Sequence, residues 1–151
     1  MASATNKVTL IAAVLPPGCV STHTLFCLRS RLPLHAQHFL CGLFNSLLVN
    51  FLVRLRVTTH VSTSTIEAVP MPTREIAPAA YREISALARV LARGWNVEAV
   101  ARLNARVAEL YQLSAAEFEY VLSTFPLIAE DERAAALACF RSSFTARSIG
   151  S

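Results

Sequence analysis

The chain has 151 residues, enough for one modest domain, and its composition excludes general disorder. Apolar residues make up 54% of the sequence and charged residues 16%, against typical fractions of about 45–50% and about 25%. The formal net charge of +4 comes from 13 arginines and a single lysine against 10 acids. This balance favours nucleic acid or an anionic membrane as a partner, although a GC-rich coding sequence also enriches arginine.

Two apolar, β-branched runs, residues 7–15 and 20–28, flank the sequence Pro16-Pro17-Gly18 and predict two short strands. A third strand is predicted at residues 66–69, where Pro70 and Pro72 end it. Strands this short need partners elsewhere in a sheet. The N-terminal part of the chain is therefore predicted to be a β portion.

A long helix is predicted over residues 34–57, because apolar residues recur there at steps of three and four. They cover most of the helix circumference, which predicts central burial. Asn45, Ser46 and Asn50 interrupt the apolar surface. We expect Asn45 and Ser46 to fix the helix against neighbouring backbone rather than to read DNA bases directly. The apolar run at residues 39–53 is shorter than the roughly 20 residues of a membrane span, so a protein interior is favoured over a bilayer.

After residue 77 the chain becomes rich in Ala, Arg, Leu and Glu, and four helices are predicted. Pro78 opens the first and Gly94 closes it; Asn96 caps the second. Ser114 and Glu117 form a capping box for the third, which Pro126 ends, and the fourth covers residues 131–140.

The predicted fold class is therefore α+β: a short N-terminal β portion, one long buried helix, a short strand and a C-terminal bundle of about four helices. We place the β portion and central helix at residues 1–76, the helical part at residues 77–142 and a disordered tail at residues 143–151. The four cysteines form no CxxC motif, and the N-terminus has no signal-peptide pattern. These features predict a cytoplasmic protein with reduced thiols.

Three stretches resemble the C-terminal specificity region of adenine-N6 DNA methyltransferases, including TaqI-like methylases, single-chain restriction-modification fusions and PglX-like phage-defence methylases. Residues 40–54 (LCGLFNSLLVNFLVR) resemble the "LLNS" helix of that region. Residues 58–72 resemble the polar segment and "LPxP" strand that follow it, and residues 110–133 resemble the closing "LYGLS..EF..IL..FP" helices. In this order the three stretches lie within residues 7–142.

The resemblance implies a DNA sequence-recognition module of an adenine-specific methyltransferase or fused restriction-modification enzyme. The sequence contains no Asn-Pro-Pro-Tyr/Phe loop, no glycine-rich S-adenosylmethionine loop and no PD-(D/E)xK nuclease set. We therefore expect no catalytic residue, cofactor or metal in this chain. S-adenosylmethionine would belong to a separate catalytic core. This chain would then be a truncated or split C-terminal fragment that binds the core and double-stranded DNA. The resemblance implies no binding to a membrane.

By the same resemblance, DNA contacts are expected where the central helix gives way to a polar stretch, although a solvated turn would have the same composition. The expected DNA-binding residues are Arg54, Arg56, Thr58, Thr59, His60, Ser62 and Thr63, with Arg29 and Arg31 as a second group. Arg82 and Arg89, a heptad apart on a predicted helix, share a face that would meet either a phosphate or solvent.

Other functions have weaker support in the sequence. The Cys19, His23 and Cys27 spacing would spread along a strand rather than meet at one zinc ion. No nucleophile elbow or paired acid indicates a hydrolase. The alternatives to DNA recognition are a non-enzymatic interaction module or membrane-associated small protein, and a decaying gene fragment with exposed apolar surface.

Overall fold

In the computed structural model, the described residues are 6–19, 27, 30–57, 61–72 and 74–148, and they form seven helices and no strand. The helices are α1 (Leu34–Asn45), α2 (Leu47–Arg54), α3 (Thr63–Glu67), α4 (Pro78–Leu91), α5 (Val97–Leu110), α6 (Ala115–Ser123) and α7 (Glu130–Ser148). The predicted α+β class is therefore wrong for this part of the chain.

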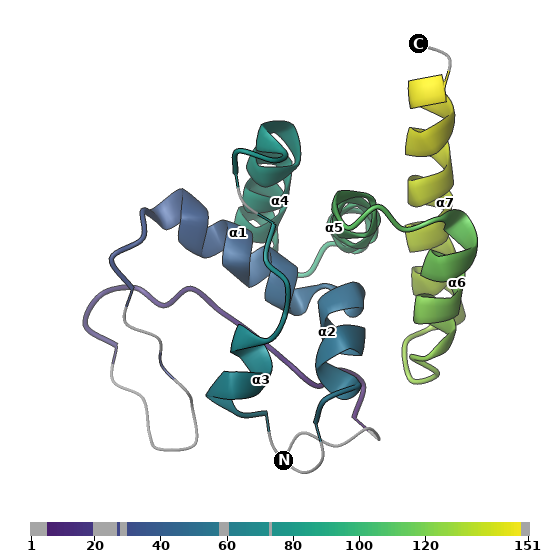
Figure 1. The fold of residues 1–151 in the computed structure, drawn as a ribbon. Helices are drawn as coiled ribbons and strands as arrows, with labels where there is room; N and C mark the ends of the chain where they lie inside the picture. The colour runs from purple at the N-terminus through teal and green to yellow at the C-terminus, as the bar shows by residue number, and fades with distance from the viewer. Residues whose placement is uncertain (1–5, 20–26, 28–29, 58–60, 73, 149–151) are drawn as a thin grey trace.

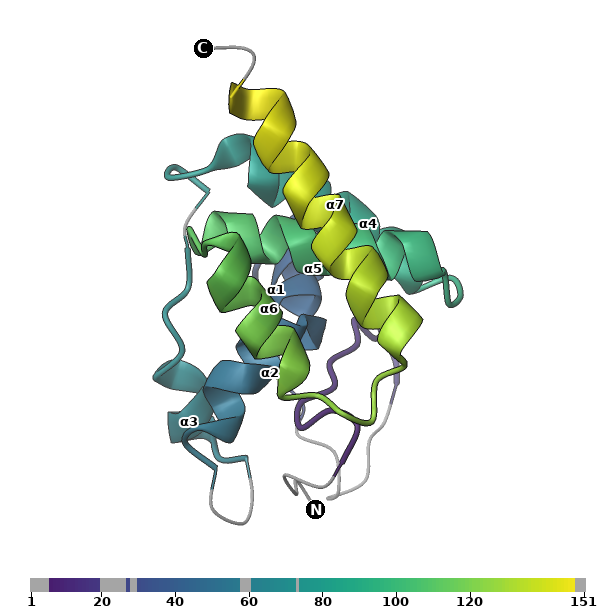
Figure 2. The same cartoon turned by 90° about the vertical axis from the view of Figure 1, so that its right-hand side faces the viewer.

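Helix α5 lies at the centre of the molecule, between α4 on one side and α7 on the other. Figure 1 views α5 nearly end-on, with α1 and α4 to one side and the α6–α7 pair to the other. Figure 2 shows α7 crossing over α5, with α6 beside it. The core between these layers is apolar, and Leu43, Ile84, Val107, Phe118 and Phe140 are fully buried in it. The fold is thus a set of packed helices in which α5 joins the α1–α4 side to the α6–α7 side.

The predicted long helix is two helices, because the chain breaks at Ser46 and α2 leaves α1 at an angle of 63°. Ser46 is extended (φ −74°, ψ 149°), and its hydroxyl accepts a hydrogen bond from the Val49 N–H. The Leu47 N–H donates to the Asn104 side chain of α5 at 2.7 Å. Two N–H groups at the start of α2 are therefore capped, one by Ser46 at the break itself and one by Asn104 of the distant helix α5.

The three predicted strands are wrong or lie outside the described residues. Residues 7–15 lack a strand ladder and instead run along the helices α1 and α2. The segment 20–28 lies outside the described residues, apart from Cys27, which is in no strand. The third segment falls at the end of α3, which begins because the Ser62 hydroxyl accepts from the Thr65 N–H. That cap favours a helical turn over the strand indicated by β-branched residues.

The predicted bundle of four C-terminal helices is confirmed as α4 to α7. Asn96 caps α5 by accepting from the Ala99 N–H at 2.8 Å, and Ser114 with Glu117 forms the predicted reciprocal capping box. The hydrogen bonds from Ser114 lower the pKa of the Glu117 carboxyl. Two boundaries differ from prediction: α4 ends at Leu91, before Gly94, and α7 continues to Ser148.

The turn after α5 places Gln112 in the left-handed region, with φ of 59°. The Leu113 N–H donates to the Ala108 carbonyl and the Gln112 N–H to the Glu109 carbonyl, which is the Schellman pattern that usually has glycine at this position. We expect Gln112→Gly to raise the free energy of unfolding by about 0.5–1 kcal/mol, because the steric cost of a Cβ is removed. Urea unfolding measures the change; an equal or lower stability would contradict this assignment of strain.

Candidate nucleic-acid interface

The amides of the central helices bind backbone, as the sequence indicated for Asn45. The N-terminal segment 6–15, here called the strap, lies against α1 and α2 with Asn45 and Asn50 beneath it. Asn45 donates to the Ala12 carbonyl at 2.7 Å and accepts from the Ala12 N–H at 3.0 Å. Asn50, which is fully buried, accepts from the N–H groups of Thr9 and Leu10. Side-chain amides thus make the hydrogen bonds to the strap backbone that a neighbouring strand would make in a sheet.

Arg54 is partly exposed, and its guanidinium group lies against the strap and the end of α6. Its guanidinium group donates to Thr9 Oγ1 at 2.8 Å, to the Asn6 and Lys7 carbonyls of the strap, and to the Thr124 carbonyl at 3.3 Å. It also lies 4.2 Å above the centre of the Phe125 ring. Burial lowers the pKa of this guanidinium group. Arg54 therefore joins the strap, α2 and the end of α6, and its donors are occupied within the chain.

Three other described residues of the expected interface lie at the surface where α2 ends and α3 begins. Arg56, Ser62 and Thr63 are exposed. Among the described residues, Arg56 makes one hydrogen bond, from Nη1 to the Leu52 carbonyl at 3.2 Å. The Ser62 hydroxyl is engaged in capping α3. Arg31 is exposed just before α1. The residues Thr58, Thr59, His60 and Arg29 lie outside the described part of the chain.

A second basic surface lies on α4, and the sequence indicated two of its three residues. Arg82 and Arg89 are exposed two turns apart on the helix, and Arg93 is exposed in the turn that closes it. We call Arg82, Arg89 and Arg93 the arginine face. Among the described residues, no carboxylate lies within ion-pair distance of any of them. The sequence placed Arg93 at the end of the same predicted helix but indicated a shared face only for Arg82 and Arg89, which are a heptad apart.

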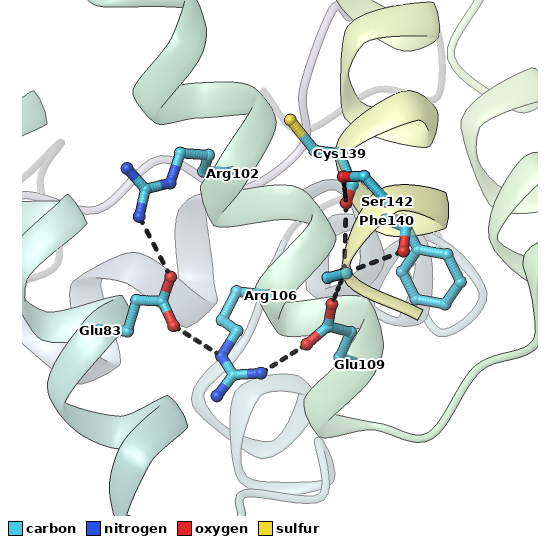
Figure 3. Close-up of polar contacts among 8 residues, drawn as sticks. Glu83, Arg102, Arg106, Glu109, Cys139, Phe140 and Ser142 are labelled. Carbon is cyan, nitrogen blue, oxygen red and sulfur yellow. Dashed lines mark hydrogen bonds and ion pairs between the residues drawn. The ribbon is translucent and has the colours of Figure 1, made fainter. Parts of the chain in front are cut away.

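The remaining arginines near α4 are paired with carboxylates. Glu83 contacts Arg102 at 3.4 Å and Arg106 at 2.9 Å, and Arg106 contacts Glu109 at 2.5 Å (Figure 3). The contact between Arg106 Nε and Glu83 is an ion pair rather than an aligned hydrogen bond, because this N–H does not point at the carboxylate oxygen. Ser143 of α7 donates to Glu109. These residues line a shallow hollow between α4, α5 and α7, and their charges balance, so the group braces the three helices.

No protein-family model, curated protein or solved structure matches this chain. Among the described residues, no group of three His, Cys, Asp or Glu side chains gathers as a metal site. No single helix in this part of the chain has the length and apolar character to cross a bilayer, and only the bent pair α1 and α2, taken together, meets both criteria.

Proposed function

We propose that this chain is a DNA sequence-recognition module that acts beside the S-adenosylmethionine-binding core of an adenine-N6 DNA methyltransferase or a fused restriction-modification enzyme. The proposal rests on the ordered resemblance of residues 40–54, 58–72 and 110–133 to the specificity region of those enzymes. The observation that carries it is the exposed polar surface after α2, where Arg56, Ser62 and Thr63 stand clear of the packed helices.

The chemistry of this surface suits base and phosphate contacts. An exposed guanidinium group binds a phosphate or a guanine edge through paired donors, and hydroxyl groups donate to or accept from either. The surface follows a helix that Arg54 and Asn50 fasten to the strap and to α6. Arg56 therefore follows a helix whose residues Leu48, Asn50 and Val53 are buried. Ser62 and Thr63 begin α3, which has no buried residue.

Apolar surface on the chain supports docking to a partner such as the catalytic core. Large apolar side chains stand exposed in several places, including Leu55 at 66%, Trp95 at 68% and Tyr120 at 64% exposure. Tyr120 of α6 and Phe51 of α2 also pack edge to face, with ring centres 6.1 Å apart. Aromatic side chains at the surface are frequent anchors of protein interfaces.

Affinity selection from a library of randomised duplexes tests the proposal. We expect the full chain to enrich a common motif, and the double variant Arg56→Ala, Thr63→Ala, which keeps the Ser62 cap of α3, to lose the enrichment while its melting temperature stays close to that of the parent. A library recovered without enrichment, under salt conditions in which the chain binds DNA, would contradict sequence recognition.

The methyltransferase part of the proposal has a separate test in the cell. Mapping of N6-methyladenine across the host genome should find the modification at the selected motif, and deletion of the gene should abolish it there. Methylation that persists unchanged at that motif after deletion would exclude this chain from the enzyme.

A further inference from the structure

We propose that the arginine face of α4, formed by Arg82, Arg89 and Arg93, binds the phosphate backbone of duplex DNA at a surface separate from the polar residues after α2. The inference rests on the proposed function for its ligand and adds a second contact surface to it. Its role would be to hold the duplex through charge, while the polar surface after α2 reads the bases.

The position of these arginines on a rigid helix supports the inference. Arg82 and Arg89 lie two helical turns apart, so their Cα atoms are separated by about 10.5 Å along the axis. Arg93 extends the charged surface into the closing turn. The total length of about 16 Å matches about five nucleotide steps of one strand at about 3.4 Å each. Three cations at this spacing therefore suit a run of phosphates.

The rest of α4 leaves the arginine face uncompensated. The single acid of the helix, Glu83, is taken by Arg102 and Arg106 of α5. Between the two helical arginines the exposed position is Ala86, whose small side chain lets a nucleic-acid backbone approach the helix. The exposed side of α4 thus carries positive charge with no acid of its own helix to neutralise it, which attracts a polyanion.

The same helix is poorly suited to an anionic membrane surface. A helix that lies on a bilayer inserts an apolar face beneath its basic residues. The apolar face of α4, with Tyr81, Ile84 and Leu87, is buried against the protein instead. Trp95 is exposed beyond the helix end, but no row of large apolar side chains accompanies the arginines along α4 itself. Nucleic acid is therefore the better match.

Duplex binding at several salt concentrations tests the inference with two variants of equal charge. The first is Arg82→Ala, Arg89→Ala, Arg93→Ala. The second is Lys7→Ala, Arg102→Ala, Arg141→Ala, which also removes three exposed cations, each paired with a carboxylate. The first variant should lower the slope of log affinity against log salt by about 2.7, at about 0.9 per lost phosphate contact. The second should leave the slope near that of the parent chain.

A third variant, Arg82→Lys, Arg89→Lys, Arg93→Lys, should retain most of the slope, because each lysine still offers a point charge. Circular dichroism of every variant establishes that the helices are intact. Equal losses in the two alanine variants would overturn the inference, since net charge alone would then account for binding.

Two further results separate failure of the inference from failure of the proposed function. If the parent chain binds duplex DNA, Arg56→Ala weakens binding and the arginine-face variant behaves like the parent, the inference is overturned and the proposed function stands. If the parent chain binds no duplex at low salt, or binds phosphatidylserine-containing vesicles through the arginine face instead, both are overturned.

Discussion

Replacing Asn50 with alanine should lower the free energy of unfolding by about 3–5 kcal/mol, a large fraction of the stability of a domain of this size. The Asn50 side chain is fully buried and makes four hydrogen bonds. Its oxygen accepts from two N–H groups of the strap, and its nitrogen donates to the carbonyls of Phe44 and Ser46, both at 3.0 Å. Alanine removes the side-chain partner of the Thr9 and Leu10 N–H groups and of the Phe44 carbonyl, and it opens a gap beside the helix break. The Ser46 carbonyl keeps its bond from the backbone N–H of residue 50.

Urea unfolding checks the size of the loss, with Asn45→Ala as the matched control. Asn45 is only partly buried and holds a single strap residue, Ala12, so we expect its loss to be about 1–2 kcal/mol. A thiol reagent provides a local measurement, because Cys41 Sγ lies 3.4 Å from the Ala12 carbonyl and burial raises the pKa of the Cys41 thiol. Release of the strap in either variant should expose this thiol, in addition to Cys19 and Cys27, which are exposed in the parent chain. Similar stability losses in both variants would contradict the central role of Asn50.

The parts of the fold that the sequence predicted well are those governed by contacts near in the chain. Asn96 lies next to the helix that it caps, and Ser114 and Glu117 are three residues apart, so each cap is visible as a local pattern. The same holds for the helical spacing of apolar residues in α4 and α5. Local patterns therefore suffice to place the four C-terminal helices, with errors confined to their ends.

Two of the parts that the sequence misplaced, the break at Ser46 and the strap, depend on contacts between distant residues. The apolar spacing of residues 34–57 continues through Ser46 without a change, and the N-cap supplied by Asn104 comes from 57 residues away. The strap has the composition of a strand, but its hydrogen-bond partners are amide side chains rather than another strand. A pattern of residue types predicts an extended backbone there; it does not distinguish a sheet partner from a pair of asparagines.

The sequence predicted only part of the candidate surface, because contacts with distant segments decide which of its arginines are exposed. Arg54 and Arg56 are two residues apart, and both were expected at DNA because they close an apolar helix. Their environments differ because the strap and Phe125 lie on the side of Arg54, whereas Arg56 is exposed. The number of arginines in a segment thus predicts a basic surface only when no other segment of the fold covers them.

Arg54→Ala should lower the free energy of unfolding by about 2–4 kcal/mol, because it removes charge-assisted hydrogen bonds to the strap and to Thr124 together with the stacking on Phe125. Arg54→Lys should not restore the stability. An ammonium group at the end of a flexible chain cannot meet partners on two separate elements, the strap and the end of α6, as a planar guanidinium group does. Thermal and urea unfolding of both variants measure the losses.

Arg56→Ala is the control for Arg54, since it removes the same side chain two residues away. Among the described residues, its one contact is to the carbonyl of Leu52 in the last turn of α2, so the stability should change by no more than about 0.5 kcal/mol. The two variants should therefore differ in which property they lose, DNA binding or stability. Arg56→Ala should weaken duplex binding at unchanged stability, whereas Arg54→Ala should destabilise the fold and affect binding only where unfolding begins. A stable Arg54→Ala variant that has lost DNA binding would instead place Arg54 in direct contact with the duplex.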